Sequence, residues 1–348
     1  MPSRGKSSKD RVTIFDIAEQ TGLSITAVSF ALNGRKGISE KNRKRVLQVA
    51  EELGWAPASA ARSLVGARTL TLGLVLARDP RGLGVESFYM QFFAGLEIEL
   101  APRGYSLLLQ VAPDRESELA TLETWRSSRR VDGVVLVDLS TDDPRVEWAN
   151  RRGALPSVVV GDPSVAGGLT SVWTDDAASM REAVAHLDDL GHRRIARVSG
   201  VGQLAHTRIR DDAFLDELDQ RELDAVLVRT DYSLEAGARV TRELLQAENR
   251  PTALIFDNDV MAVAGLSVTQ EMEMSVPTDV SLVAWDDSVL CAYTFPGLTA
   301  LSHDVVAFGS HVARRFFDVL DGAEPGAFLD STPALHVRGS TGKAPVVR

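Results

Sequence analysis

The spacing of apolar residues divides the chain near residue 68. Before that point apolar residues recur three or four positions apart, as Val46, Ala50 and Leu53 do, which is typical of amphipathic helices. Beyond it, short continuous apolar runs such as 69–77 alternate with helical segments. Strands of a parallel sheet have unbroken apolar runs because both faces of the sheet are covered. The pattern predicts a small all-α head followed by an α/β body.

The head contains the spacing of a helix-turn-helix. Ala18 is small enough for two helices to cross closely, Gly22 can adopt the positive φ of a sharp turn, and Val28 offers a stiff apolar contact. In such a motif the second helix lies in the major groove of DNA. Because the spacing also occurs by chance, the flanking residues have to support it.

Three polar residues mark where the helices of the head begin. Thr13, with an acidic residue three positions later, predicts a first helix that starts near residue 14. Ser24 is placed to cap the second helix and Ser39 a third helix at 40–53. The side of the second helix that faces away from the predicted core carries Ile25, Thr26, Ser29 and Phe30.

The segments on either side of the helix-turn-helix domain, which we place at 12–56, have no core of their own. Residues 1–11 form a basic, polar arm that we expect to be disordered. Residues 57–68 contain a run of helical propensity only two turns long. Isolated helices shorter than about 12–15 residues are marginal in water. We therefore expect this hinge to be helical only when a partner holds it.

Charge separates the head from the body. The 348-residue chain has a net charge of −10, but residues 1–68 hold 12 Lys and Arg against 6 Asp and Glu. A basic head on an acidic body predicts a nucleic-acid partner at one end only. DNA phosphates would explain the basic residues near the start of the third helix, where the helix dipole disfavours them. A solvated basic face is the alternative for Lys41, Arg43, Lys44 and Arg45.

Other features of the composition exclude several classes of protein. A single cysteine, Cys291, excludes an internal disulfide and a multi-thiolate metal site. No run approaches 18 apolar residues, so no membrane span is predicted. The polar, basic start of the chain does not resemble a secretory signal. We expect a cytoplasmic, nucleoid-associated protein without contact with a membrane.

The body alternates predicted strands and helices, which indicates parallel sheets covered on both faces. Ligands of such sheets lie at the carboxyl ends of the strands. Strands are predicted at 69–77, 105–111, 131–137, 156–160, 194–199, 225–229, 253–256, 280–285, 298–302 and 334–338. Helices are predicted at 88–103, 116–129, 143–152, 175–190, 208–221, 234–247, 260–272 and 305–320. This pattern predicts two doubly wound subdomains within residues 69–345.

Nearly the whole chain resembles the LacI/GalR family of bacterial transcription regulators. The resemblance rests on Thr13-Ile14-Phe15-Asp16-Ile17-Ala18, Gly22-Leu23-Ser24, Ala27-Val28-Ser29, Leu32-Asn33-Gly34, Ala50-x-x-Leu53-Gly54-Trp55-x-Pro57 and Ala61-x-x-Leu64. It implies a homodimer, operator DNA as a partner, and a core similar to periplasmic sugar-binding proteins. It also implies an N-subdomain at about 69–163 plus 292–324 and a C-subdomain at about 164–291 plus 325–345. The chain would cross between them near 161–170, 288–298 and 322–332.

The resemblance assigns DNA contacts to the head and hinge. Leu64 matches a leucine that wedges into the minor groove, and apolar wedges of this kind kink the duplex. Many relatives have Arg at the position of Phe30 and Asn at the position of Ala58, so we do not expect this chain to share their base preference. Phe30 could touch a thymine methyl or simply pack against the protein. The DNA-contacting positions are Thr13, Ser24, Ile25, Thr26, Ser29, Phe30, Asn33, Ala58, Ala61 and Leu64.

The resemblance also assigns an effector site to the body. Arg208 matches an arginine whose fork suits a pair of sugar hydroxyls or a carboxylate. Tyr232 matches an aromatic residue that stacks on a ring, and His303 stands where some members have Gln. A surface or capping role is the alternative for each. The expected effector residues are Asp79, Asp162, Arg208, Tyr232, Asn258, Asp286 and His303.

Two other classes of protein are considered as alternatives, a dinucleotide-binding enzyme and a small-solute binding protein. Gly200-x-Gly202-x-x-Ala205 follows a strand as a dinucleotide fingerprint would, but it lies in the second half of the body. We expect no cofactor, no metal site and no catalytic constellation. We therefore expect an effector-gated transcription regulator, most simply a repressor, whose effector is a sugar or sugar derivative. The alternative is a stand-alone small-solute binding protein of the periplasmic type.

Overall fold

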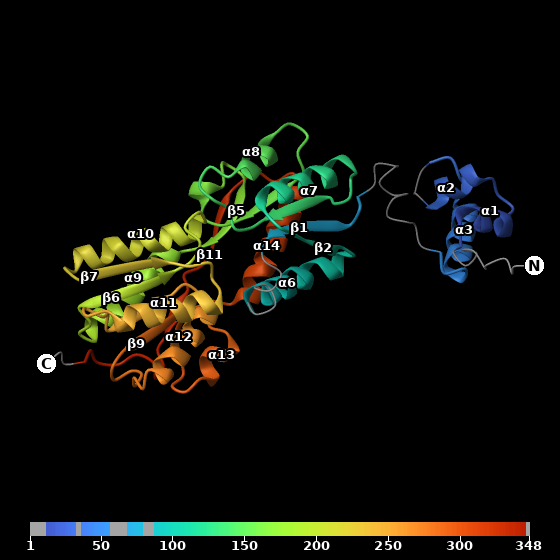
Figure 1. Ribbon diagram of the computed structural model, residues 1–348. Coiled ribbons are helices and arrows are strands. Elements are labelled where there is room, and N and C mark those ends of the chain that lie inside the picture. The colour runs from blue at the N-terminus through green and yellow to red at the C-terminus, as the bar shows by residue number, and fades with distance from the viewer. Residues whose placement is uncertain (1–11, 33–35, 56–67, 79–86, 346–348) are drawn as a thin grey trace, which may run out of the picture. The chain divides into compact units, whose positions relative to one another are not determined.

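The computed structural model describes residues 12–32, 36–55, 68–78 and 87–345. The chain divides at residue 68 into two compact units, the head and the body (Figure 1). The predicted arm at 1–11 and nearly all of the predicted hinge at 57–68 lie outside the described residues. Asn33, Ala58, Ala61, Leu64 and Asp79 lie outside them as well.

The described part of the head forms the three predicted helices, α1 Ile14–Thr21, α2 Ile25–Leu32 and α3 Glu40–Glu52. The Asp16 carboxylate accepts hydrogen bonds from the backbone nitrogen and the hydroxyl of Thr13, both at 2.7 Å. Gly22 ends α1 with a φ of 63°, the left-handed conformation that its position in the turn required.

One small apolar core holds these helices together. Its buried members come from all three helices and are Ile17, Val28, Ala31, Val46 and Ala50. Ala18 lies partly buried beside them, as its place in the helix crossing predicts. The Ser24 hydroxyl accepts a hydrogen bond from Ala27 at 3.2 Å, and the Ser39 hydroxyl accepts one from Asn42 at 3.3 Å. Each hydroxyl satisfies a backbone donor that its helix leaves unpaired.

The first sheet of the body has the order β11-β5-β4-β3-β1-β2, and all of its strand pairs are parallel. Helices α6 Ser87–Leu100 and α14 Val305–Leu320 cover one face, with α7 Arg115–Ser127 and α8 Pro144–Asn150 on the other. Helices α6 and α14 cross so closely that a side chain at Gly95 or Gly309 would overlap the backbone of the other helix. The strands are β1 Thr71–Ala77, β2 Ser106–Ala112, β3 Gly133–Leu136, β4 Ser157–Val160, β5 Thr170–Thr174 and β11 Ala327–Ser331. Short 3-10 turns occur at Ala101–Arg103 and Pro163–Val165.

The second sheet has the order β12-β10-β9-β8-β6-β7, with β12 antiparallel to β10 at one edge. Helices α9 Asp176–Asp189 and α10 Ala205–Gln220 cover one face. Helices α11 Leu234–Gln246, α12 Asp259–Glu271 and α13 Val289–Tyr293 lie on the other side (Figure 1). The strands are β6 Arg194–Ser199, β7 Asp224–Arg229, β8 Ala253–Phe256, β9 Ser281–Trp285, β10 Thr299–Ser302 and β12 Ala334–His336. The predicted fold class, two doubly wound subdomains behind a helical head, is confirmed.

The chain crosses between the two sheets three times, and the first two crossings come later than we predicted. The crossings follow β5 at residue 174, β10 at residue 302 and β11 at residue 331. The first window was misplaced because β5 was not recognised, and the second because the strand at 298–302 was assigned to the N-subdomain. The third crossing begins inside the predicted window of 322–332, although β11, which pairs with β5, was not recognised. The N-subdomain therefore contains residues 170–174 and 305–331, and the C-subdomain contains 299–302. No helix among the described residues is long and apolar enough to cross a membrane.

Candidate functional site

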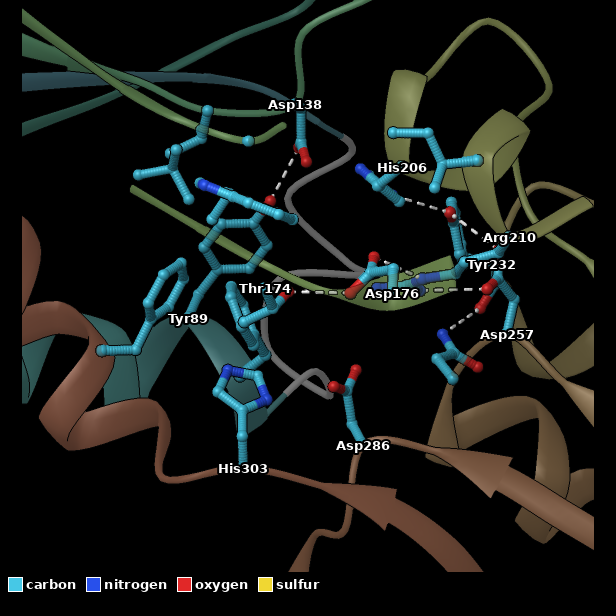
Figure 2. A pocket seen from close by; sticks show the side chains of 18 of the residues that line it. Tyr89, Asp138, Thr174, Asp176, His206, Arg210, Tyr232, Asp257, Asp286 and His303 are labelled. Atoms are coloured by element: carbon cyan, nitrogen blue, oxygen red, sulfur yellow. Dashed lines mark hydrogen bonds and ion pairs between the residues drawn. The ribbon is translucent and has the colours of Figure 1, made fainter. Parts of the chain in front are cut away.

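A cavity of about 150 Å³ is lined by side chains from both subdomains of the body (Figure 2). The N-subdomain contributes Asp138, two residues after β3, and Thr174 at the end of β5. The C-subdomain contributes Asp257 after β8 and Asp286 after β9. All four residues lie at the carboxyl ends of parallel strands, which is where doubly wound sheets bind ligands.

Arg210 on α10 is the central cation of the cavity. Its Nε donates to Asp176 at 2.8 Å and its Nη1 donates to Asp257 at 3.0 Å. Its guanidinium carbon lies 3.8 Å from the ring centroid of Trp285, so the flat face of the group rests on an aromatic ring. These contacts fix the guanidinium in one orientation at the cavity wall.

Asp257 ties Arg210 to a buried polar network. Its carboxylate accepts hydrogen bonds from Arg197 at 2.9 Å, from the backbone nitrogen of Gly200 at 3.0 Å and from the Tyr232 hydroxyl at 3.2 Å. Burial opposes ionisation, but the two guanidiniums outweigh it and lower the pKa of Asp257 to about 2. The carboxylate is therefore charged throughout the neutral range and fully engaged by the protein.

On the opposite wall, Arg78 engages Asp138. The Arg78 Nε and the Tyr89 hydroxyl both donate to the Asp138 carboxylate, at 2.8 and 2.7 Å. The Arg78 guanidinium also lies 5.3 Å from the ring centroid of Tyr89 and 5.4 Å from that of Tyr232. Since Tyr232 belongs to the C-subdomain, Arg78 links the two walls.

Asp286 and His303 differ from these paired groups. Burial, reinforced by neighbouring carboxylates, raises the pKa of Asp286 to about 8, although Arg210 opposes the shift. The His303 Nε2 is buried without a hydrogen-bond partner among the described residues, and burial lowers the pKa of its imidazole. Figure 2 shows both side chains rising from their strand ends into the cavity. They are suited to bind a ligand because the protein leaves them unsatisfied.

The lining as a whole suits a small polar ligand. The aromatic side chains of Phe88, Tyr89, Trp173 and Phe308 supply apolar surface, and the residues at the strand ends supply hydrogen-bonding groups. Sites of this composition orient a small molecule with a few polar contacts. Within the described residues, no group of three His, Cys, Asp or Glu side chains could hold a metal ion.

The head offers a separate surface. Ile25 is 45% exposed, and Thr13, Ser24 and Thr26 are also exposed at or near the start of α2 and α1. Ser29 and Phe30 are half-buried. The Phe30 ring packs close to the backbone at Gly37, which favours the packing role over contact with a thymine methyl. Exposed apolar and hydroxyl groups at the start of a second helix are what base readout requires.

Comparison with known proteins identifies the family. Residues 13–58 match "Bacterial regulatory proteins, lacI family" and residues 184–341 match "Periplasmic binding protein-like domain". The chain is 30% identical over 318 residues to the transcriptional regulator CelR of Thermobifida fusca, covering 90% of this chain and 93% of CelR. This chain belongs to the LacI family of bacterial transcription regulators.

Solved structures of LacI-family proteins share the fold. A LacI family regulator from Bifidobacterium animalis subsp. lactis is 36% identical with a TM-score of 0.74, covering 80% of this chain and 100% of that chain. A CelR–cellobiose complex is 26% identical with a TM-score of 0.72, covering 95% and 100%. The Lac repressor dimer bound to operator and the anti-inducer ONPF has a TM-score of 0.81 at 24% identity, covering 95% and 99%. The relatives are transcription regulators rather than enzymes.

Five of the residues that we expected at the effector site line the cavity. Asp162, Tyr232, Asn258, Asp286 and His303 all do so. Asn258 also caps α12, because its side-chain oxygen accepts from Met261 at 2.8 Å and its amide donates to the backbone oxygen of Tyr232. Asp162 likewise caps a short 3-10 turn through Ser164. The capping alternative therefore describes part of the role of these two residues.

Arg208, which we expected at the effector site, does not line the cavity of this LacI-family chain. Helix α10 begins at Ala205, three residues earlier than predicted, and this places Arg208 on its exposed side. Arg210 follows two residues later, which is about 200° around a helix, and its side chain lines the cavity. The first two turns of α10 contain both arginines, and the sequence alone did not indicate which of them faces the cavity.

Several lining residues were missed by the sequence interpretation. Asp138 and Asp257 each follow a predicted strand, so the rule that ligands lie at strand ends could have found them. His206 was not among the expected residues, yet it lines the cavity and its Nε2 lies 3.1 Å from the Tyr232 hydroxyl. Asp176 could not be placed because β5, the strand before it, was not recognised.

Proposed function

We propose that this LacI-family regulator is a repressor whose operator affinity is controlled by a small polyhydroxylated effector in the body cavity. One observation carries the proposal: a basic helix-turn-helix and a two-subdomain cavity with unsatisfied polar groups lie in one chain. The CelR–cellobiose complex and the Lac repressor–operator complex, which pair the same two parts, support it.

A homodimer is part of the proposal, because a pseudo-palindromic operator needs two heads. The body carries a cluster of exposed apolar side chains on and after α13. Tyr293 is 85% and Phe295 90% exposed, and Val289 and Leu290 lie beside them in the chain. Large exposed apolar patches mark interaction surfaces. We infer that α13 contributes to the contact between two copies.

The effector acts through the two walls of the cavity. Arg78 and Asp138 belong to one subdomain, and Tyr232 and Asp257 to the other, so a ligand between them favours one relative placement of the subdomains. Such a ligand changes DNA affinity only if it binds the two states of the protein unequally. Sugars are our proposed class because hydroxyl-rich ligands match a lining of carboxylates, guanidiniums and aromatic rings.

Fluorescence anisotropy with DNA from the region around the protein's own gene tests the proposal. We expect sequence-preferring binding whose affinity falls steeply as salt is raised, because phosphate contacts release counterions. A thermal-shift screen against sugars and nucleosides then identifies the effector, which raises the apparent stability of the body. Binding of a sugar without any preference among DNA sequences would favour a stand-alone solute-binding protein.

A further inference from the structure

The cavity has an unusual balance of charge. Among the described residues, six aspartates line it, Asp138, Asp162, Asp176, Asp257, Asp259 and Asp286, against two arginines, Arg78 and Arg210. The raised pKa of Asp286 leaves that carboxyl mostly uncharged, but the aspartates still outnumber the arginines. A ligand that carries a carboxylate or phosphate would add a further negative charge to this excess. Burial strengthens such repulsion because the local dielectric constant is low. The lining therefore disfavours acidic sugars, phosphorylated sugars and other anions.

Neither arginine offers an uncommitted charge to an anion. Arg210 is held by Asp176 and Asp257 and rests on Trp285. Arg78 is held by Asp138 and lies between two tyrosine rings. A ligand anion would have to displace a protein carboxylate from a charge-assisted hydrogen bond, and bonds of this kind are the stronger ones.

The groups left unsatisfied on the β8 and β9 side of the cavity are acids or a neutral imidazole. The Asp286 carboxyl has no hydrogen-bond partner among the described residues. Asp259 is only 3% exposed, and its Oδ2 is buried without a partner. The neighbouring His303 Nε2 is also unpartnered. The Oδ1 of Asp259 accepts a hydrogen bond from the backbone nitrogen of Val260 at 2.8 Å, which leaves its Oδ2 and the Asp286 carboxyl to bind a ligand. Unpaired carboxyl oxygens are the complement of a positively charged donor.

We propose that the effector is a monosaccharide-sized polyol that carries a protonated amine, and that the ammonium group binds beside Asp286 and Asp259. This inference rests on the proposed effector-gated function and gives the chemical class of the effector. The size follows from the cavity of about 150 Å³, which is smaller than the roughly 300–1,000 Å³ of sites for drug-sized ligands. The aromatic side chains Trp173 and Phe88 supply the faces on which a sugar ring packs.

Proton release on binding distinguishes an amine effector from a neutral sugar. The charged groups that face Asp286 are Arg210, Asp176, Asp257 and Asp259, with His303 nearby. The raised pKa of Asp286, about 8, means that the carboxyl is mostly protonated at pH 6.5 in the free protein. An ammonium group favours the ionised carboxylate. Binding of an amine therefore releases a proton, whereas binding of a neutral sugar retains it.

The test uses the full chain and three matched sets of probes. D-glucosamine, D-galactosamine and D-mannosamine are each compared with the neutral parent sugar and the corresponding uronic acid by isothermal titration calorimetry at pH 6.5. We expect at least one amino sugar to bind about tenfold or more tightly than its parent, with the uronic acid weakest. The heat should differ between phosphate and Tris buffers because a proton is released.

Two variants separate the role of Asp286 from a general effect of charge. Asp286→Asn keeps the shape of the side chain and should reduce the preference for the amine to about threefold or less, with loss of the buffer dependence. Glu248→Gln removes one negative charge from an exposed site outside the cavity lining and should change neither quantity. The wild-type comparison stands by itself if Asp286→Asn does not fold.

The inference is overturned if a parent sugar or uronic acid binds as tightly as its amine, or if none of the three amines binds. Operator binding is measured on the same preparation by anisotropy. Sequence-specific DNA binding without amine binding overturns only the effector class. Absence of sequence-specific DNA binding overturns the proposed function itself.

Discussion

The head and the body of this chain are stabilised in different ways. The head has one small apolar core of five buried side chains, whereas the body has four larger clusters and a network of buried ion pairs. The head is basic and the body acidic. In the head, therefore, function depends directly on folding, because the surface that meets DNA is the outside of a minimal core. In the body, function depends on a few polar groups within a larger fold, whose free energy of unfolding we expect to exceed that of the head.

The number of residues in each unit predicts how large its free energy of unfolding is. Domains are stable by roughly 0.05–0.15 kcal/mol per residue, which gives the head, at residues 12–55, about 2–7 kcal/mol. Each core residue of the head accounts for a large share of that value. The body can lose a similar amount of free energy and stay folded at ordinary temperatures.

The largest effect is expected from Ile17→Ala in the head. Ile17 is fully buried at the centre of the head core. Truncating a buried Ile typically costs about 2–5 kcal/mol, which is comparable to the whole stability of the head. We expect complete loss of operator binding by anisotropy with an unchanged thermal transition of the body by calorimetry.

Phe15→Ala is the matched control for folding, since Phe15 lies two residues away on α1 and is 65% exposed. It should leave the free energy of unfolding of the head within about 0.5 kcal/mol of the wild-type value. Operator binding by Ile17→Ala at wild-type affinity would contradict the comparison, because the head would then not depend on its small core.

The second prediction concerns Arg197 in the body. Arg197 is fully buried and donates to Asp211 at 2.7 Å and to Asp257 at 2.9 Å. Removing one partner of a buried ion pair costs about 3–5 kcal/mol, because a charge is left buried and unpaired. We expect Arg197→Ala to lower the unfolding temperature of the body while the head still binds DNA non-specifically.

Arg239→Ala is its control. Arg239 pairs with Glu243 one turn along α11, and both side chains are 60% exposed. Surface pairs of this kind contribute about 1 kcal/mol at most. Equal destabilisation by the two variants would show that burial does not decide the value of these ion pairs.

The sequence predicted the fold well wherever periodicity was strong. Gly22, Thr13, Ser24 and Ser39 mark the helix limits of the head through local backbone chemistry, and all four have the predicted roles. In the body, long apolar strands flanked by helices were recognised, since burial on both faces leaves an unbroken apolar run. Local signals of this kind can be read without knowing what lies across the core.

The cavity was predicted less well because its chemistry depends on geometry. Five of the expected residues line it, but Arg208 and Arg210 lie two positions apart and the sequence alone did not indicate which one faces inward. The pairing of Asp257 with Arg197, 60 positions away, has no local signature. Strand β5 was missed because Thr170, Ser171 and Thr174 are polar, so its five residues contain no unbroken apolar run.

The third prediction compares those two arginines. Arg210→Ala removes the cation that orients Asp176 and Asp257, so we expect effector affinity to fall about tenfold or more, measured by calorimetry with the ligand that the screen identifies. Arg208→Ala, on the exposed side of the same helix, should change it less than about twofold. DNA affinity without effector should be unchanged in both variants. A larger effect from Arg208→Ala would mean that the effector contacts the outside of α10.

The smallest effect comes from removing one helix cap in each unit. Ser39 caps α3 in the head and Ser233 caps α11 in the body, each accepting one backbone hydrogen bond. Replacing either with Ala costs about 1 kcal/mol. A fixed loss of free energy lowers the unfolding temperature in inverse proportion to the unfolding entropy, which grows with chain length. Calorimetry should therefore show a decrease of about 11 °C in the head for Ser39→Ala but only about 2 °C in the body for Ser233→Ala. Equal shifts would mean that the head and the body unfold as one cooperative unit. The two regions would then differ in charge but not in how they are stabilised.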